Sequence, residues 1–144
     1  MSTLPIRICT IDTPETAKFG KKGQPFGEEA KEALSDMVFD RKVRVRLLQR
    51  DQYGRAVAQV DQPVAWWRKF FQWVLVAFRG STTCVDEVLL RKGLAEVYQG
   101  SGAVYGPLGK ERYMEIQDEA KQQKIGIWSL KNRESAAEYK RRNK

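Results

Sequence analysis

The sequence predicts a single domain of α+β class. Three segments that are β-branched or alternate in hydrophobicity predict strands, at residues 6–11, 43–49 and 56–60. Three runs with helical spacing predict packed helices, at residues 26–39, 85–92 and 107–124. The chain has 144 residues, of which 42% are hydrophobic, and this is enough for one core.

The elements of the N-terminal half follow one another closely. Pro14 ends the first strand, because a residue that precedes proline avoids helical geometry. A loop with Lys21 and Lys22 comes next and is expected to be exposed and basic. The helix at residues 26–39 then begins with acidic residues, which favour the N-terminal end of a helix dipole.

The second and third strands are predicted to form a hairpin. Alternation from residue 43 onward indicates that Val45 and Leu47 point to the core while Arg44 and Arg46 point to solvent. The turn between the strands has the sequence Asp-Gln-Tyr-Gly-Arg at residues 51–55, and its glycine accepts the positive φ of a tight turn.

An aromatic stretch at residues 63–79 follows the third strand, and its secondary structure is left open. Three roles fit residues 66–78, which begin with Trp66 and end with Phe78: extra core, a segment lying on a membrane surface, or a stacking platform for single-stranded bases.

The C-terminal half is predicted to be mainly helical. Gly93 ends the helix at residues 85–92. The domain is placed at residues 1–130, and residues 131–144 are interpreted as a disordered basic tail.

The composition excludes several chemistries. The chain has no histidine, so His-based hydrolysis and His-bearing zinc sites are excluded. Its two cysteines, Cys9 and Cys84, are expected to be buried free thiols. A net charge of +8 favours a polyanionic partner. The sequence has no apolar run long enough to span a membrane.

Arginines and carboxylates occur together at the ends of the predicted strands. Arg7 lies on the first strand, which leads into Asp12 and Glu15, and Arg55 ends the hairpin turn. Arginine suits the phosphate oxygens of a phosphodiester transition state, and carboxylates suit a hard cation such as Ca²⁺ or an attacking water. The set therefore points to phosphodiester cleavage.

These residues also carry a resemblance to a known family. The motifs, in chain order, are ICTIDTPET at residues 8–16, PFGEEAK at 25–31, DQYGRAVA at 51–58, LLRKGLA at 89–95, and EAK with GIW at 119–128. Their order and spacing resemble the staphylococcal nuclease-like family. The loop GSGAVYG at residues 100–106 is most similar to the fungal mitochondrial, membrane-anchored branch.

The resemblance implies an OB-like β-barrel with packed helices and a Ca²⁺-dependent nuclease that hydrolyses DNA or RNA. It implies that Arg7 and Arg55 bind phosphate, that Glu15 orients or deprotonates water, and that Asp12 and the Thr13 carbonyl hold Ca²⁺. Further contacts to nucleic acid are expected from the basic and aromatic residues Lys21, Lys22, Arg44, Arg46 and Tyr53. A monomer is expected, in an intracellular location that is mitochondrial or membrane-associated where an upstream segment directs it.

The sequence departs from the family pattern at its start. The family has two further strands before the position of Ile6, and the turn between them supplies another calcium-binding carboxylate. With three evident strands we expect an incomplete barrel and weaker metal binding. The alternative function is therefore a catalytically inactive OB-fold module that binds nucleic acid or a protein partner.

Overall fold

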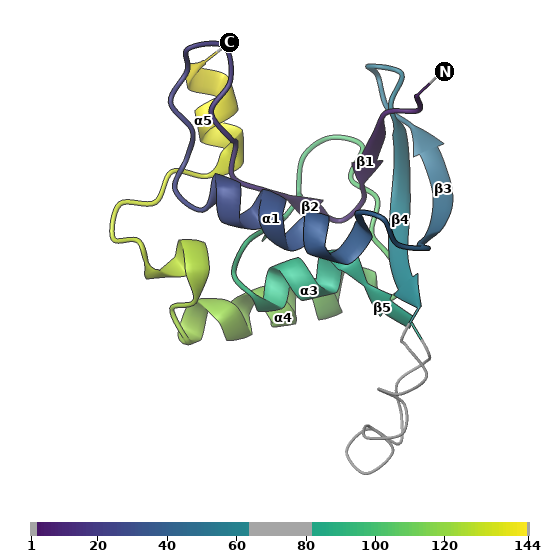
Figure 1. The fold of residues 1–144 in the computed structure, drawn as a ribbon. Coiled ribbons are helices and arrows are strands. Elements are labelled where there is room, and N and C mark those ends of the chain that lie inside the picture. Colours follow the sequence, from purple (N-terminus) through teal and green to yellow (C-terminus); the bar gives the residue numbers. More distant parts are fainter. Residues whose placement is uncertain (1–2, 64–81, 144) are drawn as a thin grey trace.

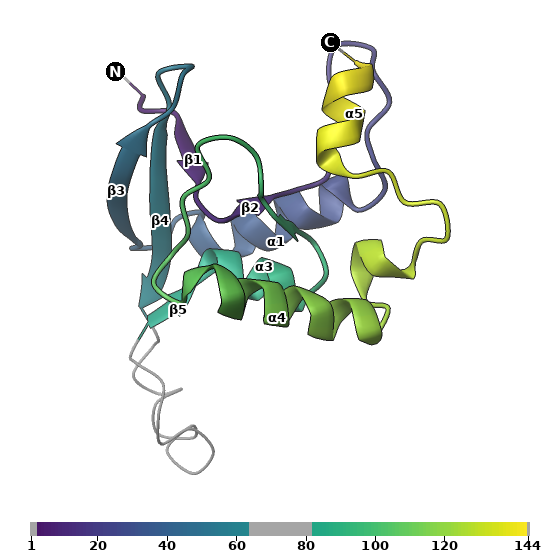
Figure 2. The same cartoon turned by 180° about the vertical axis from the view of Figure 1, so that it is seen from behind.

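The structure, a computed structural model, describes residues 3–63 and 82–143. Its strands are β1 (Ile6–Ile8), β2 (Ile11–Asp12), β3 (Arg44–Arg50), β4 (Ala56–Pro63), β5 (Thr82–Cys84) and β6 (Glu96–Val97). Its helices are α1 (Gly27–Val38), α3 (Val85–Arg91), α4 (Gly109–Gln122), the 3₁₀ turn η1 (Gly126–Ser129) and α5 (Ala136–Arg142). The sheet lies at one end of the molecule, and α5 lies at the other, beside the loop that leaves β2 (Figures 1 and 2).

The main sheet is built around β4. Strand β1 pairs with β4 in parallel, while β3 and β5 pair with it in antiparallel fashion, and β2 and β6 form a separate antiparallel pair. The described strands do not close into a barrel. The predicted α+β, OB-like architecture is confirmed as an open one, and β5 is a short addition that the sequence pattern did not reveal.

The first predicted strand is broken in two at Thr10. Thr10 has a φ of 71°, which a residue with a branched side chain adopts only when its surroundings impose it. Its N–H donates to Val104 O at 2.8 Å, and its carbonyl accepts from Tyr98 N at 2.7 Å. Its hydroxyl accepts from Gly106 N at 2.8 Å. These bonds turn the chain from β1 to β2 and carry Asp12 away from the main sheet.

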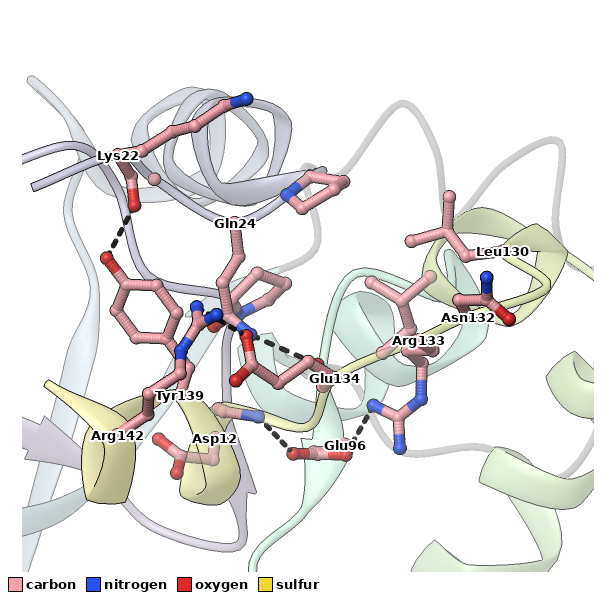
Figure 3. Close-up of a pocket in the computed structure, with 15 residues that line it drawn as sticks. Asp12, Lys22, Gln24, Glu96, Leu130, Asn132, Arg133, Glu134, Tyr139 and Arg142 are labelled. Carbon is pink, nitrogen blue, oxygen red and sulfur yellow. Dashed lines mark hydrogen bonds and ion pairs between the residues drawn. The ribbon is translucent and has the colours of Figure 1, made fainter.

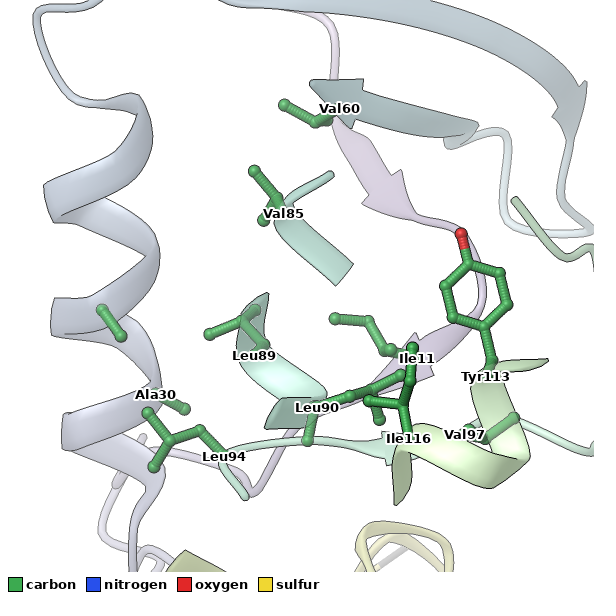
Figure 4. Packing of buried hydrophobic residues seen from close by; sticks show 12 residues of the cluster. Ile11, Ala30, Val60, Val85, Leu89, Leu90, Leu94, Val97, Tyr113 and Ile116 are labelled. Atoms are coloured by element: carbon green, nitrogen blue, oxygen red, sulfur yellow. The ribbon is translucent and has the colours of Figure 1, made fainter. Parts of the chain in front are cut away.

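The core lies between the helices and the inner face of the sheet (Figure 4). Its buried members come from α1, α3, α4 and the strands, and they include Ile11, Ala30, Val60, Val85, Leu89, Leu90, Leu94, Val97, Tyr113 and Ile116. The three predicted helices are α1, α3 and α4, and their apolar faces meet here.

Strand β3 differs from its prediction in burial. Val45 and Leu47 pair with Val60 and Ala58, so they lie on the same face of the sheet as these two buried residues. They are nevertheless 40% and 60% exposed. Alternation predicted the correct face, but β3 is the edge strand and lies beyond the reach of the helices that cover β4.

The basic segment predicted to be a disordered tail carries helix α5. Ser135 accepts a hydrogen bond from Glu138 N, and the Glu138 carboxylate accepts from Ser135 N at 2.8 Å, which forms a capping box. Ala136 and Tyr139 are buried. The prediction of disorder was wrong because it weighed the charge of the segment above this local cap.

The aromatic stretch lies outside the described residues, except for Pro63 at the end of β4. The three roles considered for residues 66–78 therefore stay predictions. Within residues 3–63 and 82–143, no helix is long and apolar enough to cross a membrane.

Candidate active site

Of the two candidate phosphate-binding arginines, one lies on β1 and the other directly precedes β4, the strand that pairs with β1. Arg7 on β1 pairs with Val57 on β4, and Arg55 lies two residues before Val57. Side chains two residues apart on a strand share a face, so Arg7 and Arg55 lie on one face of the sheet as diagonal neighbours. The backbone fixes this arrangement further, because Ala56 N donates to Pro5 O at 3.0 Å.

Each of these guanidinium groups is held by a neighbour. Arg7 stacks on the Tyr98 ring, with 4.2 Å between the guanidinium carbon and the ring centroid. Arg55 lies over the Tyr53 ring at 5.5 Å and donates from Nε to Asp51 Oδ2 at 2.7 Å. Both arginines are half-buried. Their heads are therefore oriented before any ligand arrives.

Asp51 orients Arg55 through the hairpin itself. Its Oδ1 accepts the backbone N–H groups of Tyr53 and Arg55, both at 2.9 Å. Burial acts to raise the pKa of Asp51, but the backbone and side-chain hydrogen bonds of Arg55 outweigh it and hold that pKa below its ordinary value. The carboxylate is thus charged and fixed beside the arginine that it positions.

The two candidate carboxylates, Asp12 and Glu15, both contact one lysine side chain and are called the acidic pair. Lys140 Nζ of α5 lies 2.7 and 2.9 Å from the two oxygens of Asp12 and 3.2 Å from Glu15 Oε1. Burial alone would lower the pKa of Lys140, but the carboxylates of Asp12 and Glu15 raise it above its usual range. Asp12 and Glu15 are therefore close enough to share one positive charge.

The loop that carries Glu15 is fixed by one residue, Gln24. Glu15 N donates to Gln24 Oε1 at 3.0 Å, and Gln24 N donates to Glu15 O at 2.8 Å. Gln24 Nε2 also donates to Glu134 O at 3.0 Å, so the same residue links the acidic loop to the C-terminal segment. Thr13 lies between Asp12 and Glu15 in this loop and is half-buried.

The carboxylate oxygens of Asp12 and Glu15 are donors that suit a hard cation, but the two residues carry only two negative charges. Ca²⁺ takes about six to eight oxygen ligands, which include carboxylates, carbonyls and water. Asp12, Glu15 and the Thr13 carbonyl supply oxygens of that kind. Among residues 3–63 and 82–143, no group of three or more His, Cys, Asp or Glu side chains is arranged to hold a metal ion. The described residues therefore supply only part of a cation's ligand shell, and water or substrate phosphate would have to supply the rest.

A pocket of about 280 Å³ opens beside Asp12 (Figure 3). It lies between the end of β2, the loop at residues 22–25 and the C-terminal segment. Inside it Glu96 accepts from Arg133 at 2.6 Å and from Ala136 N at 3.0 Å. Tyr139 on α5 donates its hydroxyl to Lys22 O at 2.5 Å.

The residues predicted to contact nucleic acid divide between two places. Arg44 and Arg46 are exposed and pair with Asp61 and Gln59, and the alternation of β4 places these partners on the face that carries Arg7 and Arg55. Tyr53 is exposed at the tip of the hairpin. Lys21 and Lys22 lie instead on the loop beside α5, where Lys21 Nζ donates to Asn143 O.

Comparison with known proteins decides the family. The model of the family described as staphylococcal nuclease homologue matches residues 5–130, which is most of the chain. The chain belongs to the staphylococcal nuclease family. This confirms the resemblance drawn from its motifs.

Relatives within the staphylococcal nuclease family bear endonuclease names. The chain is similar to "Endonuclease Htp3" of Saprolegnia parasitica, with 43% identity over 98% of this chain and 60% of that protein. It is 42% identical to "Probable endonuclease lcl3" of Schizosaccharomyces japonicus, over 99% of this chain and 57% of that protein. "Probable endonuclease LCL3" of Schizophyllum commune is also 42% identical, over 97% and 46% of the two chains. The chain thus spans about half to three fifths of these relatives.

The sequence did not reveal the C-terminal part of this nuclease-family site. Gln24 and Lys140 connect the loop of Asp12 and Glu15 to the last segment of the chain. Tyr139 connects that segment to Lys22, and Glu96 on β6 connects to it through Arg133 and Ala136. The one local signal was the Ser135 to Glu138 spacing of a capping box, which marks a helix start but says nothing about where the helix docks.

Proposed function

We propose that this domain is a nuclease that hydrolyses phosphodiester bonds of DNA or RNA with the help of Ca²⁺. The observation that carries the proposal is that Arg7 on β1 and Arg55, directly before β4, lie beside one another at paired strands, in a chain whose family bears the name of a nuclease. The acidic pair Asp12 and Glu15 supports it, because these carboxylates follow Arg7 closely along the chain, after the turn between β1 and β2.

The proposed roles follow from the chemistry of phosphodiester hydrolysis. A water oxygen attacks phosphorus, the bond from phosphorus to the leaving sugar oxygen breaks, and negative charge grows on the other phosphate oxygens. Arg7 and Arg55 neutralise that charge with paired N–H donors, which is the geometry in which arginine surpasses lysine. Their stacking on Tyr98 and Tyr53 reduces the reorganisation needed when the charge appears.

Glu15 accepts the proton that the attacking water gives up. Its backbone is fixed on both sides by Gln24, so the part of the loop that carries the carboxylate has a defined position. Asp12 and the Thr13 carbonyl hold the cation, and a bound Ca²⁺ would polarise the phosphate and lower the barrier to attack. Arg44 and Arg46 extend the basic face along which a polyanionic strand lies.

One observation favours the alternative of an inactive binding module. The described residues offer only two converging carboxylates, and both are engaged by Lys140. A module of this kind would use the basic sheet face for binding and would leave the nucleic acid intact.

Cleavage of labelled single-stranded DNA and RNA, in Ca²⁺ or in EGTA, separates the two functions. The wild type is expected to cut in Ca²⁺ only. Arg55→Lys keeps the charge but loses the paired donors, so its kcat/KM is expected to fall on the order of 10²-fold. The matched control is Lys110→Gln on α4, outside the proposed site, which is expected to cut as the wild type does. Binding without cutting would support the inactive module.

A further inference from the structure

Lys140 provides the counter-charge for the acidic pair. Its ammonium nitrogen is within 3.2 Å of both carboxylates and contacts both oxygens of Asp12. The proposed function places a divalent cation on Asp12, whose two oxygens Lys140 already contacts. The ammonium and a metal ion need the same carboxylate lone pairs, so they exclude one another.

Specific contacts dock α5 over the acidic pair. The capping box at Ser135 and Glu138 fixes the first turn of the helix. Glu96 holds the segment before it through Arg133 and Ala136 N, and Tyr139 bonds to Lys22 O. Lys140 follows directly on Tyr139, so the docking of the tyrosine delivers the lysine to the carboxylates.

The same contacts can be undone without unfolding the domain. Helix α5 has seven residues, and only Ala136 and Tyr139 among them are buried. Its remaining contacts are polar and lie at or near the surface, where water replaces them at small cost. Segments with few buried apolar contacts open locally, well below the free energy of global unfolding.

We propose that α5 is a latch that closes the cation site of this domain. In the latched state Lys140 occupies the place of the metal, and a divalent cation binds only when α5 withdraws. Since ligands shift a conformational equilibrium toward the state they bind, rising Ca²⁺ opens the latch. This inference rests on the proposed function, because it takes Asp12 as the carboxylate that holds the cation, with Glu15 beside it.

Calorimetric titration of the full chain with Ca²⁺, at fixed ionic strength, tests the competition. Lys140→Gln removes the competing ammonium and is expected to raise the Ca²⁺ affinity on the order of tenfold over the wild type. Arg141→Gln, which removes the same charge from the next residue of the helix, is the matched control and is expected to change affinity less than about twofold. Equal affinities for the two variants would overturn the latch.

Hydrogen exchange on the wild type supplies a readout that depends neither on a variant nor on activity. Saturating Ca²⁺ is expected to speed the exchange of the amides at residues 136–143, relative to the same protein in EGTA. Unchanged or slower exchange at saturating Ca²⁺ would refute the latch.

The two proposals fail in different ways. If Asp12→Asn abolishes Ca²⁺ binding while Lys140→Gln binds as the wild type does, the metal site stands and the latch is refuted. If neither the wild type nor Lys140→Gln binds Ca²⁺, no competition exists and the latch is refuted as well. The cleavage assay in Ca²⁺ and EGTA then decides the proposed function on its own.

Discussion

The close approach of Gly93 to the backbone of Ile125 gives the sharpest prediction about the fold. A methyl group on Gly93 would lie 2.3 Å from Ile125 O and 2.7 Å from Ile125 C, and Gly93 has a φ of +63°. Both clashing atoms are backbone, so no side chain can rotate away. Ile127 N also donates to Gly93 O at 2.9 Å, which ties η1 to the end of α3.

The cost of Gly93→Ala has two parts. Left-handed backbone costs an L-residue roughly 1–2 kcal/mol, and overpacking against a fixed neighbour costs roughly 1–3 kcal/mol more. Together these predict a loss of about 3 kcal/mol of unfolding free energy. With a urea m-value of about 2 kcal/mol/M, the unfolding midpoint falls by about 1.5 M.

Gly102→Ala is the matched control for Gly93→Ala. Gly102 has a φ of +69° but nothing within 4 Å of the added methyl group, so it measures the backbone cost alone. Its urea midpoint, followed by circular dichroism, is expected to fall by roughly 0.5–1 M. If Gly93→Ala unfolds at the same urea concentration as Gly102→Ala, the close backbone approach is wrong.

Three further predictions concern buried groups and the C-terminal cap. Burial raises the pKa of Asp86, so the unfolding free energy of the wild type falls as pH rises from about 4 through that pKa. Asp86→Asn is expected to flatten this pH dependence. A variant whose urea midpoint changes with pH between 4 and 7 as that of the wild type does would contradict the raised pKa. Burial raises the pKa of Cys84 to about 12, so a thiol reagent should label it only on unfolding, and fast labelling of the native protein would count against its burial. Ser135→Ala removes the capping box and should weaken α5 by about 1 kcal/mol, seen as faster amide exchange at residues 136–143; exchange as slow as in exposed Ser101→Ala would argue against the cap.

Local patterns located the strand that carries Arg7 and the turn that carries Arg55. The β-branched run around Arg7 and the turn before Arg55 are short-range signals, and parallel pairing of their strands then brings the two residues together. Asp12 and Glu15 were singled out by their chemistry and their place after the first strand, and the family motif then supplied their separate roles. The break at Thr10 was missed because its positive φ is imposed by partners at residues 98–106, which no local window contains.

Long-range docking accounts for what the sequence did not predict. Lys140 and Asp12 are 128 residues apart, and no periodicity links them. Local charge predicted a solvated tail, whereas the contacts of Tyr139 and Glu96 dock the C-terminal segment on the domain. For β3 the alternation predicted the correct face of Val45 and Leu47, but whether a neighbouring element covers that face is decided elsewhere in the chain.

The central claim is that the arginine face and the acidic loop form one catalytic site, and a double-mutant cycle measures it most directly. Residues that act as a unit in one transition state lose activity together, so their individual losses do not multiply. The kcat/KM of Arg7→Lys, Glu15→Gln and the double variant would be compared on single-stranded DNA in Ca²⁺. We expect the kcat/KM of the double variant to be only slightly lower than that of the less active single variant. A double variant whose loss equals the product of the two single losses would contradict a shared site.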